Sequence, residues 1–235
     1  MTESLSSRQV SRLRRRDEVL EEEGRSREAL ICQQKAVALD PNDPKGREDL
    51  AQMYLELSRY DEAIVECKAL LRLAPKSLFA RDIMSVAYLQ KGDTDRALVV
   101  NDELIRLSPN DPRNHFKRGS LCQQRGDWRS AMQSLMLAHR IAPVDSVEEE
   151  EAEEAIDALD RHQIKQLVLL LSEDRSLQIR IAREPEETIT ERGYALSPVA
   201  LNFIQQVATG SVQSQVLIGK ENEYLPAQSR FRYYN

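Results

Sequence analysis

The side chains that could perform acid–base or metal chemistry are dispersed along this 235-residue chain. Its three histidines, His115, His139 and His162, are too far apart to form a local metal-binding motif such as H-x-x-x-H. The sequence contains neither a glycine-rich phosphate loop nor a G-x-S-x-G nucleophile motif. We therefore expect a protein that is not an enzyme and that uses no cofactor or metal ion.

The remaining composition narrows the class of protein further. Three cysteines, Cys32, Cys67 and Cys122, have no metal-like spacing, and we expect them to be small buried hydrophobes in a reducing cytoplasm. A net charge of −6 argues against sequence-independent binding of nucleic acid. The longest wholly apolar run, Leu167–Leu171, is too short to span a bilayer, and the polar start does not resemble a signal peptide. These features predict a cytoplasmic protein that binds no membrane.

The strongest pattern in the sequence is a period of 34 residues. Prolines recur at this spacing, at Pro41, Pro75, Pro109 and Pro143. An alanine lies twelve residues before each proline, at Ala29, Ala63, Ala97 and Ala131. Seventeen residues before the prolines lie Gly24, Ser58, Gly92 and Gly126. A fixed period of this length indicates stacked repeat units.

Each residue type that recurs at this spacing has a physical reason for its position. Glycine permits the positive φ of a tight turn between two helices. Alanine lets two helix backbones approach closely where they cross. Proline after the second helix ends that helix and directs the chain into the next unit. Each unit is therefore predicted to be a helix, a turn and a second helix, and one core is predicted to run along the whole stack.

The slots of this pattern resemble those of the tetratricopeptide repeat (TPR) family. That family has a small residue and then an aromatic one in the first helix, a small residue in the second helix, and a final proline. The slots hold Ala51, Tyr54, Ala63 and Pro75, then Ser85, Tyr88, Ala97 and Pro109, then Gly119, Cys122, Ala131 and Pro143. The resemblance implies an all-α, right-handed helix-turn-helix repeat solenoid of about three and a half to four TPR units. The units are placed at residues 10–43, 44–77, 78–111 and 112–145. The first unit matches least, because Arg16 and Asp17 occupy slots that are usually apolar and small.

The segments on either side of the repeats differ in composition. Residues 1–9 are expected to be disordered. The arginine-rich helix that follows, ending near Glu23, is either an anion contact or a solvated outer helix of the array. Residues 146–160 are predicted to form an acidic capping helix, in which one apolar stripe is made by Ala152, Ala155, Ile156 and Leu159. Its glutamates are either the solvated face of the cap or a surface for a basic partner.

Residues 161–207 are predicted to form a small C-terminal helical unit that does not follow the repeat. Within it, Glu173–Ile181 is either a strand or a short helix. Residues 174–207 weakly resemble small helical leader domains of bacterial peptide precursors, which is a clue to shape only. Residues 208–235, rich in aromatic and basic residues, are expected to be a flexible tail; the alternatives are that they fold back on the C-terminal unit or bind a partner.

The TPR resemblance also implies a concave groove lined by the first helix of each unit. Nine groove positions are the predicted partner-binding residues: Lys45, Glu48, Gln52, Phe79, Asp82, Val86, Arg113, Phe116 and Ser120. Phe79 and Phe116, flanked by Asp82 and Arg113, have the composition of a binding hot spot. The alternative is that both phenylalanines pack between adjacent repeats.

Some members of the family hold the C-terminal carboxylate of chaperones in a clamp of lysine, asparagine and arginine. The corresponding slots here hold Arg14, Glu18, Asp49, Phe79 and Ile83, so we predict no binding of chaperone tails. The first hypothesis is a non-enzymatic adaptor or scaffold that binds a peptide or helix of a partner protein in the groove. One alternative is a structural homo-oligomer that self-associates through the groove or the C-terminal unit. The other is a regulatory subunit of a separate enzyme.

Overall fold

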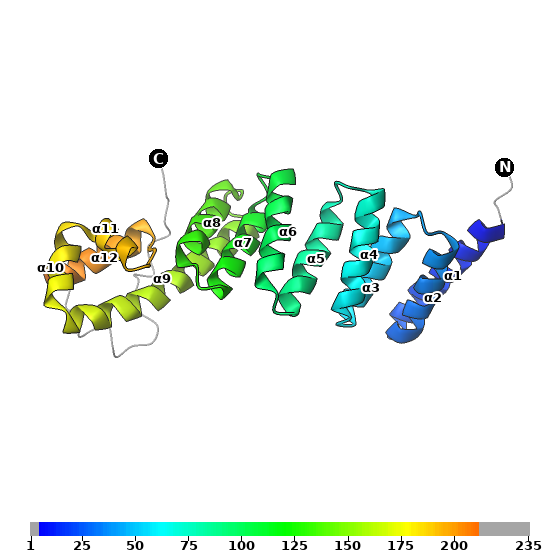
Figure 1. Cartoon of the computed structure of the whole chain (residues 1–235), viewed down its shortest axis with the longest axis horizontal. Helices are drawn as coiled ribbons and strands as arrows, with labels where there is room; N and C mark the ends of the chain where they lie inside the picture. Colours follow the sequence, from blue (N-terminus) through cyan, green and yellow to red (C-terminus); the bar gives the residue numbers. More distant parts are fainter. Residues whose placement is uncertain (1–4, 212–235) are drawn as a thin grey trace. The chain divides into compact units, whose positions relative to one another are not determined.

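A computed structural model describes residues 5–211, which form twelve α-helices and no strand (Figure 1). The all-α expectation is therefore confirmed. The chain divides into two compact units between Arg125 and Gly126, inside the repeat expected at 112–145. No helix in the described residues is long and apolar enough to cross a membrane.

The first unit contains seven helices. They are α1 (Leu5–Glu22), α2 (Ser26–Leu39), α3 (Pro44–Glu56), α4 (Tyr60–Leu73), α5 (Leu78–Gln90), α6 (Thr94–Leu107) and α7 (Pro112–Gln124). Each helix packs against the next one along the chain, and α3 also contacts α5 (Figure 1). This arrangement is a helical repeat solenoid, with α1/α2, α3/α4 and α5/α6 as consecutive pairs.

The turns and caps of the first unit follow from its glycine, serine and aspartate residues. Gly24 and Gly92 have φ of +72° and +78° between the helices of their pairs, and Ser58 takes the same left-handed conformation at +58°. Asp43 and Asp111 cap α3 and α7: each side chain accepts a hydrogen bond from the backbone N–H two residues later, at 3.1 Å. A proline follows each cap as the first residue of the helix. These turn and cap residues thus set where the helices begin and end.

A buried polar side chain ties one repeat to the next at two places. Gln33 Nε2 donates to the Gly46 carbonyl oxygen at 2.9 Å, and Asn101 Nδ2 donates to the Asn114 carbonyl oxygen at 2.9 Å. The two side chains are wholly buried and occupy the same slot of the 34-residue pattern. Cys67 fills this slot in the intervening repeat, where burial raises the pKa of its thiol to about 12. Cys67 is therefore a neutral packing residue, as expected from the sequence.

The second unit contains five helices. They are α8 (Trp128–Ile141), α9 (Val147–Glu173), α10 (Arg175–Arg183), α11 (Pro185–Glu191) and α12 (Pro198–Thr209). Helix α8 packs against α9, and the C-terminal part of α9 packs with α10–α12. The core between these last four helices is centred on buried aliphatic side chains, among them Leu167, Leu177, Ile181 and Ile204.

Helix α9 differs from the sequence expectation. Residues 146–160 and the start of 161–207 were expected to be separate helices, but α9 is one helix of 27 residues. The segment contains no glycine or proline to end it, and buried Leu159 is followed on the same face by buried Gln163 and Leu167. The acidic cap is therefore the first half of a helix that continues into the C-terminal core.

Three further segments are now assigned. Residues 175–183 form a helix and not a strand, because Leu177 and Ile181 are buried one turn apart while Ile179 is 48% exposed. The expected disorder of residues 1–9 is wrong for Leu5–Gln9, which belong to α1. The expected tail at 208–235 begins too early, since α12 continues to Thr209 and ends at left-handed Gly210. Residues 212–235 lie outside the described part of the chain.

Candidate functional site

The nine predicted groove residues all lie on first helices of repeats in the first unit. Lys45, Glu48 and Gln52 are on α3, Phe79, Asp82 and Val86 are on α5, and Arg113, Phe116 and Ser120 are on α7. Lys45 and Arg113 are exposed, and the other seven residues are half-buried. Because α3 contacts α5 and an ion pair joins α5 to α7, these helices form one continuous row. We call α1, α3, α5 and α7 together the first-helix row.

The ion pair between α5 and α7 joins Asp82 to Lys117. Lys117 follows Phe116 directly and was not predicted as a site residue. Arg113, which was expected to flank the aromatic pair, lies instead at the cap of its own helix, with Nε 3.4 Å from Asp111 Oδ1. The structure thus brings Asp82 together with Lys117 and does not pair it with Arg113.

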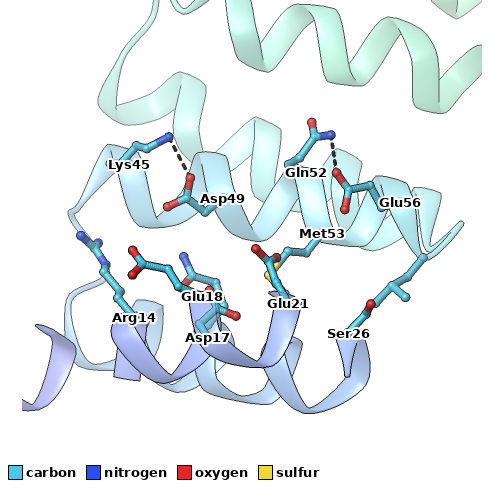
Figure 2. Close-up of a pocket in the computed structure, with 12 residues that line it drawn as sticks. Arg14, Asp17, Glu18, Glu21, Ser26, Lys45, Asp49, Gln52, Met53 and Glu56 are labelled. Atoms are coloured by element: carbon cyan, nitrogen blue, oxygen red, sulfur yellow. Dashed lines mark hydrogen bonds and ion pairs between the residues drawn. The ribbon is translucent and has the colours of Figure 1, made fainter. Parts of the chain in front are cut away.

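A cavity of about 600 Å³ lies among α1, α2 and α3, at the start of the first-helix row (Figure 2). Five carboxylates line it: Asp17, Glu18 and Glu21 from α1, and Asp49 and Glu56 from α3. Two cations line it as well, Arg14 and Lys45. We call this cavity the acidic pocket. Lys45 and Gln52 belong both to the acidic pocket and to the predicted groove residues.

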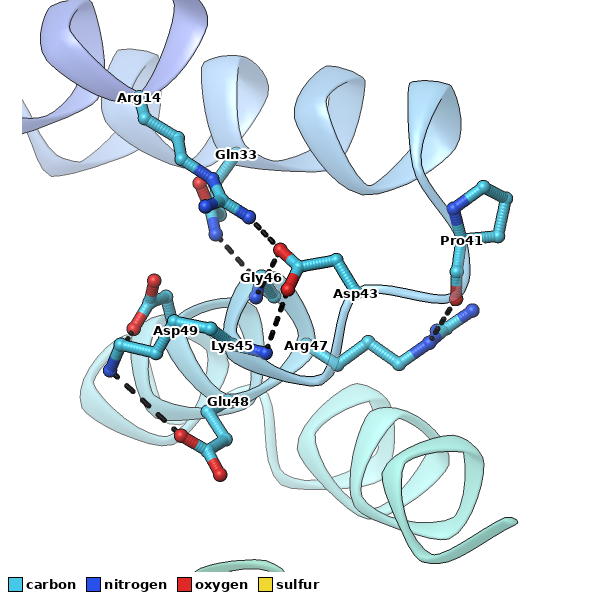
Figure 3. A network of polar contacts seen from close by, with 9 residues as sticks. All are labelled: Arg14, Gln33, Pro41, Asp43, Lys45, Gly46, Arg47, Glu48 and Asp49. Atoms are coloured by element: carbon cyan, nitrogen blue, oxygen red, sulfur yellow. Dashed lines mark hydrogen bonds and ion pairs between the residues drawn. The ribbon is translucent and has the colours of Figure 1, made fainter. Parts of the chain in front are cut away.

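The two cations of the acidic pocket are already engaged. Arg14 forms an ion pair with the α3 cap, Asp43, and Lys45 Nζ lies 2.8 Å from Asp49 Oδ1 (Figure 3). Further along α3, Gln52 Nε2 donates to Glu56 Oε1 at 2.7 Å (Figure 2).

The three carboxylates that α1 contributes, at Asp17, Glu18 and Glu21, have no such partner. None of them forms an ion pair with another described residue. They therefore line the cavity with negative charge that no ion pair within the described residues neutralises.

Asp17 is the most confined of these carboxylates. Only 7% of the residue is exposed, and its Oδ1 is buried without a hydrogen-bond partner. Burial raises the pKa of Asp17 to about 6, and the negative charges of Glu21, Asp49 and Glu18 add to the rise. The pKa of Glu21 is also raised, first by burial and then by Glu56 and Asp49. A buried carboxylate without a partner is costly, so this arrangement is unfavourable for the folded protein alone.

The acidic pocket was missed from the sequence, although one signal for it was visible. Asp17 stands in the small-residue slot that Ala51, Ser85 and Gly119 fill in the later repeats. A charged residue in a helix-crossing position that elsewhere needs a small side chain is a departure that points to a local function. The convergence of α1 and α3 carboxylates could not be seen, because it depends on how the two helices pack.

The comparisons with known proteins agree with the repeat pattern. Two tetratricopeptide repeat family profiles match, one at residues 32–65 and one at residues 85–168, and together they cover half of the chain. The chain belongs to the tetratricopeptide repeat family. The matched residues include α3 and Phe116, whereas Phe79 and the α1 residues of the acidic pocket lie outside both matches.

Solved TPR structures share this fold at low sequence identity. MamA (residues 41 to the end) from Desulfovibrio magneticus RS-1 is 17% identical with a TM-score of 0.54, covering 64% of this chain and 93% of that one. MamA from AMB-1 is 20% identical with a TM-score of 0.52, covering 59% and 76% of the two chains. No curated protein sequence matches the chain. None of these comparisons supports the resemblance of residues 174–207 to leader domains.

Proposed function

We propose that this TPR protein is a non-enzymatic adaptor that binds a peptide or helix of a partner protein along its first-helix row. The observation that carries the proposal is the pair Phe79 and Phe116, half-buried on the neighbouring helices α5 and α7. The Asp82–Lys117 ion pair lies between the same two helices. Aromatic rings beside charged groups are typical of the energetically dominant centre of protein interfaces.

Two further observations support this proposal. Membership of the TPR family places the chain among repeat arrays, whose stacked helices create extended binding surfaces. The sequence also contains no local catalytic motif that would favour an enzymatic role. A partner that lay along α3, α5 and α7 would lie against the three helices that carry the nine predicted residues.

The test uses the whole chain and peptides selected on it from a random display library. Affinities of the selected peptides are then measured by fluorescence anisotropy for the wild type and for a Phe79→Ala/Phe116→Ala variant. The matched control is Val65→Ala/Val99→Ala, because these valines are 62% and 60% exposed on second helices of the same unit. Circular dichroism must first show that all three proteins are equally helical.

We expect the phenylalanine variant to bind at least about tenfold more weakly, and the valine variant to bind as the wild type does. Equal binding by the wild type and the phenylalanine variant would place the site elsewhere. Failure to select any peptide would count against the adaptor function itself. A dimer that only the phenylalanine variant loses, seen by sedimentation, would instead favour self-association through the same helices.

A further inference from the structure

The acidic pocket is built for a positively charged guest. Five carboxylates line it, of which Asp49 is paired with Lys45, and the other lining cation, Arg14, is paired with Asp43 outside the lining. The independent observation that points to a ligand is Asp17, which lines the pocket, is more than nine-tenths buried and leaves Oδ1 without a partner. Gln33, which is wholly buried, also lines this cavity, and its Oε1 has no hydrogen-bond partner. Acceptors that are buried and unsatisfied are rare in native proteins, and a donor brought by a ligand satisfies them.

The chemistry of the pocket favours an organic cation over a metal ion. Within the described residues, no group of three or more histidine, cysteine, aspartate or glutamate side chains converges closely enough to hold a metal. The acceptors are instead spread over a cavity of about 600 Å³, which is large enough for an extended side chain. A guanidinium or ammonium group carries several N–H donors and can reach acceptors that lie apart.

We propose that the acidic pocket binds an arginine or lysine side chain of the partner peptide, with Asp17 as its buried acceptor and Glu18 and Glu21 as its charged rim. This inference rests on the proposed adaptor function and specifies the chemistry of the partner. The pocket is continuous with the proposed binding surface, since Lys45 and Gln52 belong to both. The basic residue of the partner therefore lies on α1 and α3, and its apolar residues lie further along the row, against Phe79 and Phe116.

Burial explains why one added cation has a large effect at this site. The pKa of Asp17 is raised because its charge is poorly solvated and is repelled by Glu21, Asp49 and Glu18. A guest cation reverses both contributions by supplying hydrogen bonds and opposite charge to the same carboxylate. Binding of a basic side chain thus relieves the unfavourable burial and repulsion of the Asp17 carboxylate, and this relief contributes to the affinity.

The first experiment uses peptides selected on the whole chain, each compared with a copy in which its arginine or lysine is replaced by glutamine. Affinities are measured for the wild type, for Asp17→Asn/Glu21→Gln and for Glu22→Gln/Glu23→Gln. The last variant is a matched control, because it makes the same change in charge at the last residue of α1 and the residue after it, and neither residue lines the pocket. The expected result is at least about a tenfold loss for the glutamine peptide on the wild type and on the control. On the pocket variant the loss should be less than about threefold.

The outcomes separate this inference from the proposed function. One outcome is that the selected peptides depend on Phe79 and Phe116 but lose equal affinity for all three proteins when their basic residue is replaced. This result would overturn the pocket assignment and leave the adaptor function standing. Selected peptides that contain no arginine or lysine would also overturn the pocket assignment and leave the adaptor function standing. Failure to select any peptide would contradict the adaptor function. Binding of a cation in the acidic pocket would then be tested with a small-molecule probe.

That probe is agmatine, a free guanidinium compound, titrated into the isotope-labelled whole chain and followed by NMR. Binding in the pocket predicts saturable shifts of backbone amides around Asp17 and Asp49 in the wild type and in the Glu22→Gln/Glu23→Gln control. The Asp17→Asn/Glu21→Gln variant should lose these shifts. Absence of saturable shifts in the wild type, or identical shifts in the pocket variant, would overturn the proposal.

Discussion

The side-chain amide of Gln163 forms two hydrogen bonds with the backbone of Ala195, 32 residues further along the chain. Nε2 donates to the Ala195 carbonyl oxygen at 2.8 Å, and Oε1 accepts from the Ala195 N–H at 2.7 Å. Almost one turn earlier on α9, Asp160 Oδ1 accepts from the Ser197 N–H at 3.0 Å. The link between α11 and α12 is thus fastened to the middle of α9 by buried polar groups.

This fastening predicts a large effect of Gln163→Leu on the stability of the second unit. Leucine fits the volume but leaves the N–H and C=O of Ala195 without partners, at a cost of about 2–4 kcal/mol in the free energy of unfolding. Urea denaturation followed by the fluorescence of Trp128 measures it, because this single tryptophan lies in the same unit. The control is Gln166→Leu, an exposed position one turn away. A loss as small as that of the control would show that Ala195 is satisfied in another way.

The buried carboxylate of Asp17 predicts that the first unit is more stable in mild acid than at neutral pH, as far as this residue is concerned. Its pKa is raised by burial from 3.8 to about 6, so the folded state holds the proton more tightly than the unfolded state. The free energy of unfolding therefore falls as the pH rises from about 4 to about 6, by on the order of 2–3 kcal/mol. Asp17→Asn removes this loss and should stabilise the protein by about that amount at pH 7.5.

The gain from Asp17→Asn should shrink as the pH falls below 6 and largely vanish near pH 4. Urea denaturation followed by circular dichroism, with both proteins at each pH, measures the difference. The paired comparison is needed because burial also raises the pKa of Asp160, in the second unit, to about 6. A variant that is less stable than the wild type at pH 7.5 would show that the ionised Asp17 has a stabilising partner.

The repeat architecture was predictable because its signals are local. Gly24, Gly92 and Asp43 act through the backbone geometry of the turn or cap in which each one lies, and a 34-residue period repeats such signals several times. The acidic pocket was not predictable, because Glu21 and Glu56 come to line one cavity only through the packing of α1 and of α3 against α2. The continuity of α9 lies between these cases: no residue ends the helix, yet only the shared core with α10–α12 shows that both halves are one element.

Gly46 predicts an unusual response to a substitution that normally favours helices. A Cβ at this position would lie 2.8 Å from Asp43 Oδ2 and 3.0 Å from Arg14 Nη2 (Figure 3). Asp43 cannot move away freely, because its carboxylate caps α3 and pairs with Arg14. The crowding should outweigh the gain of about 1 kcal/mol in helix propensity, so Gly46→Ala should destabilise the protein by about 1 kcal/mol.

Thermal or urea denaturation followed by circular dichroism measures this change. In the double variant Arg14→Ala/Gly46→Ala, one of the two crowded neighbours is absent, so the added methyl group should cost less than it does in the wild-type background. A Gly46→Ala variant that is more stable than the wild type would show that the Asp43 side chain moves away from the added methyl group at little cost.

The charge of the acidic pocket predicts discrimination against the acidic C-terminal peptides that some TPR proteins bind. The slots of the carboxylate clamp hold Glu18 and Asp49 beside Arg14, and Arg14 is paired with Asp43. A peptide with an acidic C-terminus would bring further negative charge to this surface, and like charges there are repulsive. Fluorescence anisotropy with such a peptide should detect no binding at micromolar concentrations of the protein. An otherwise identical peptide with lysines in place of its acidic residues should bind more tightly, and its affinity should fall as salt screens the charges. Micromolar affinity for the acidic peptide would contradict both the prediction and the proposed role of the pocket.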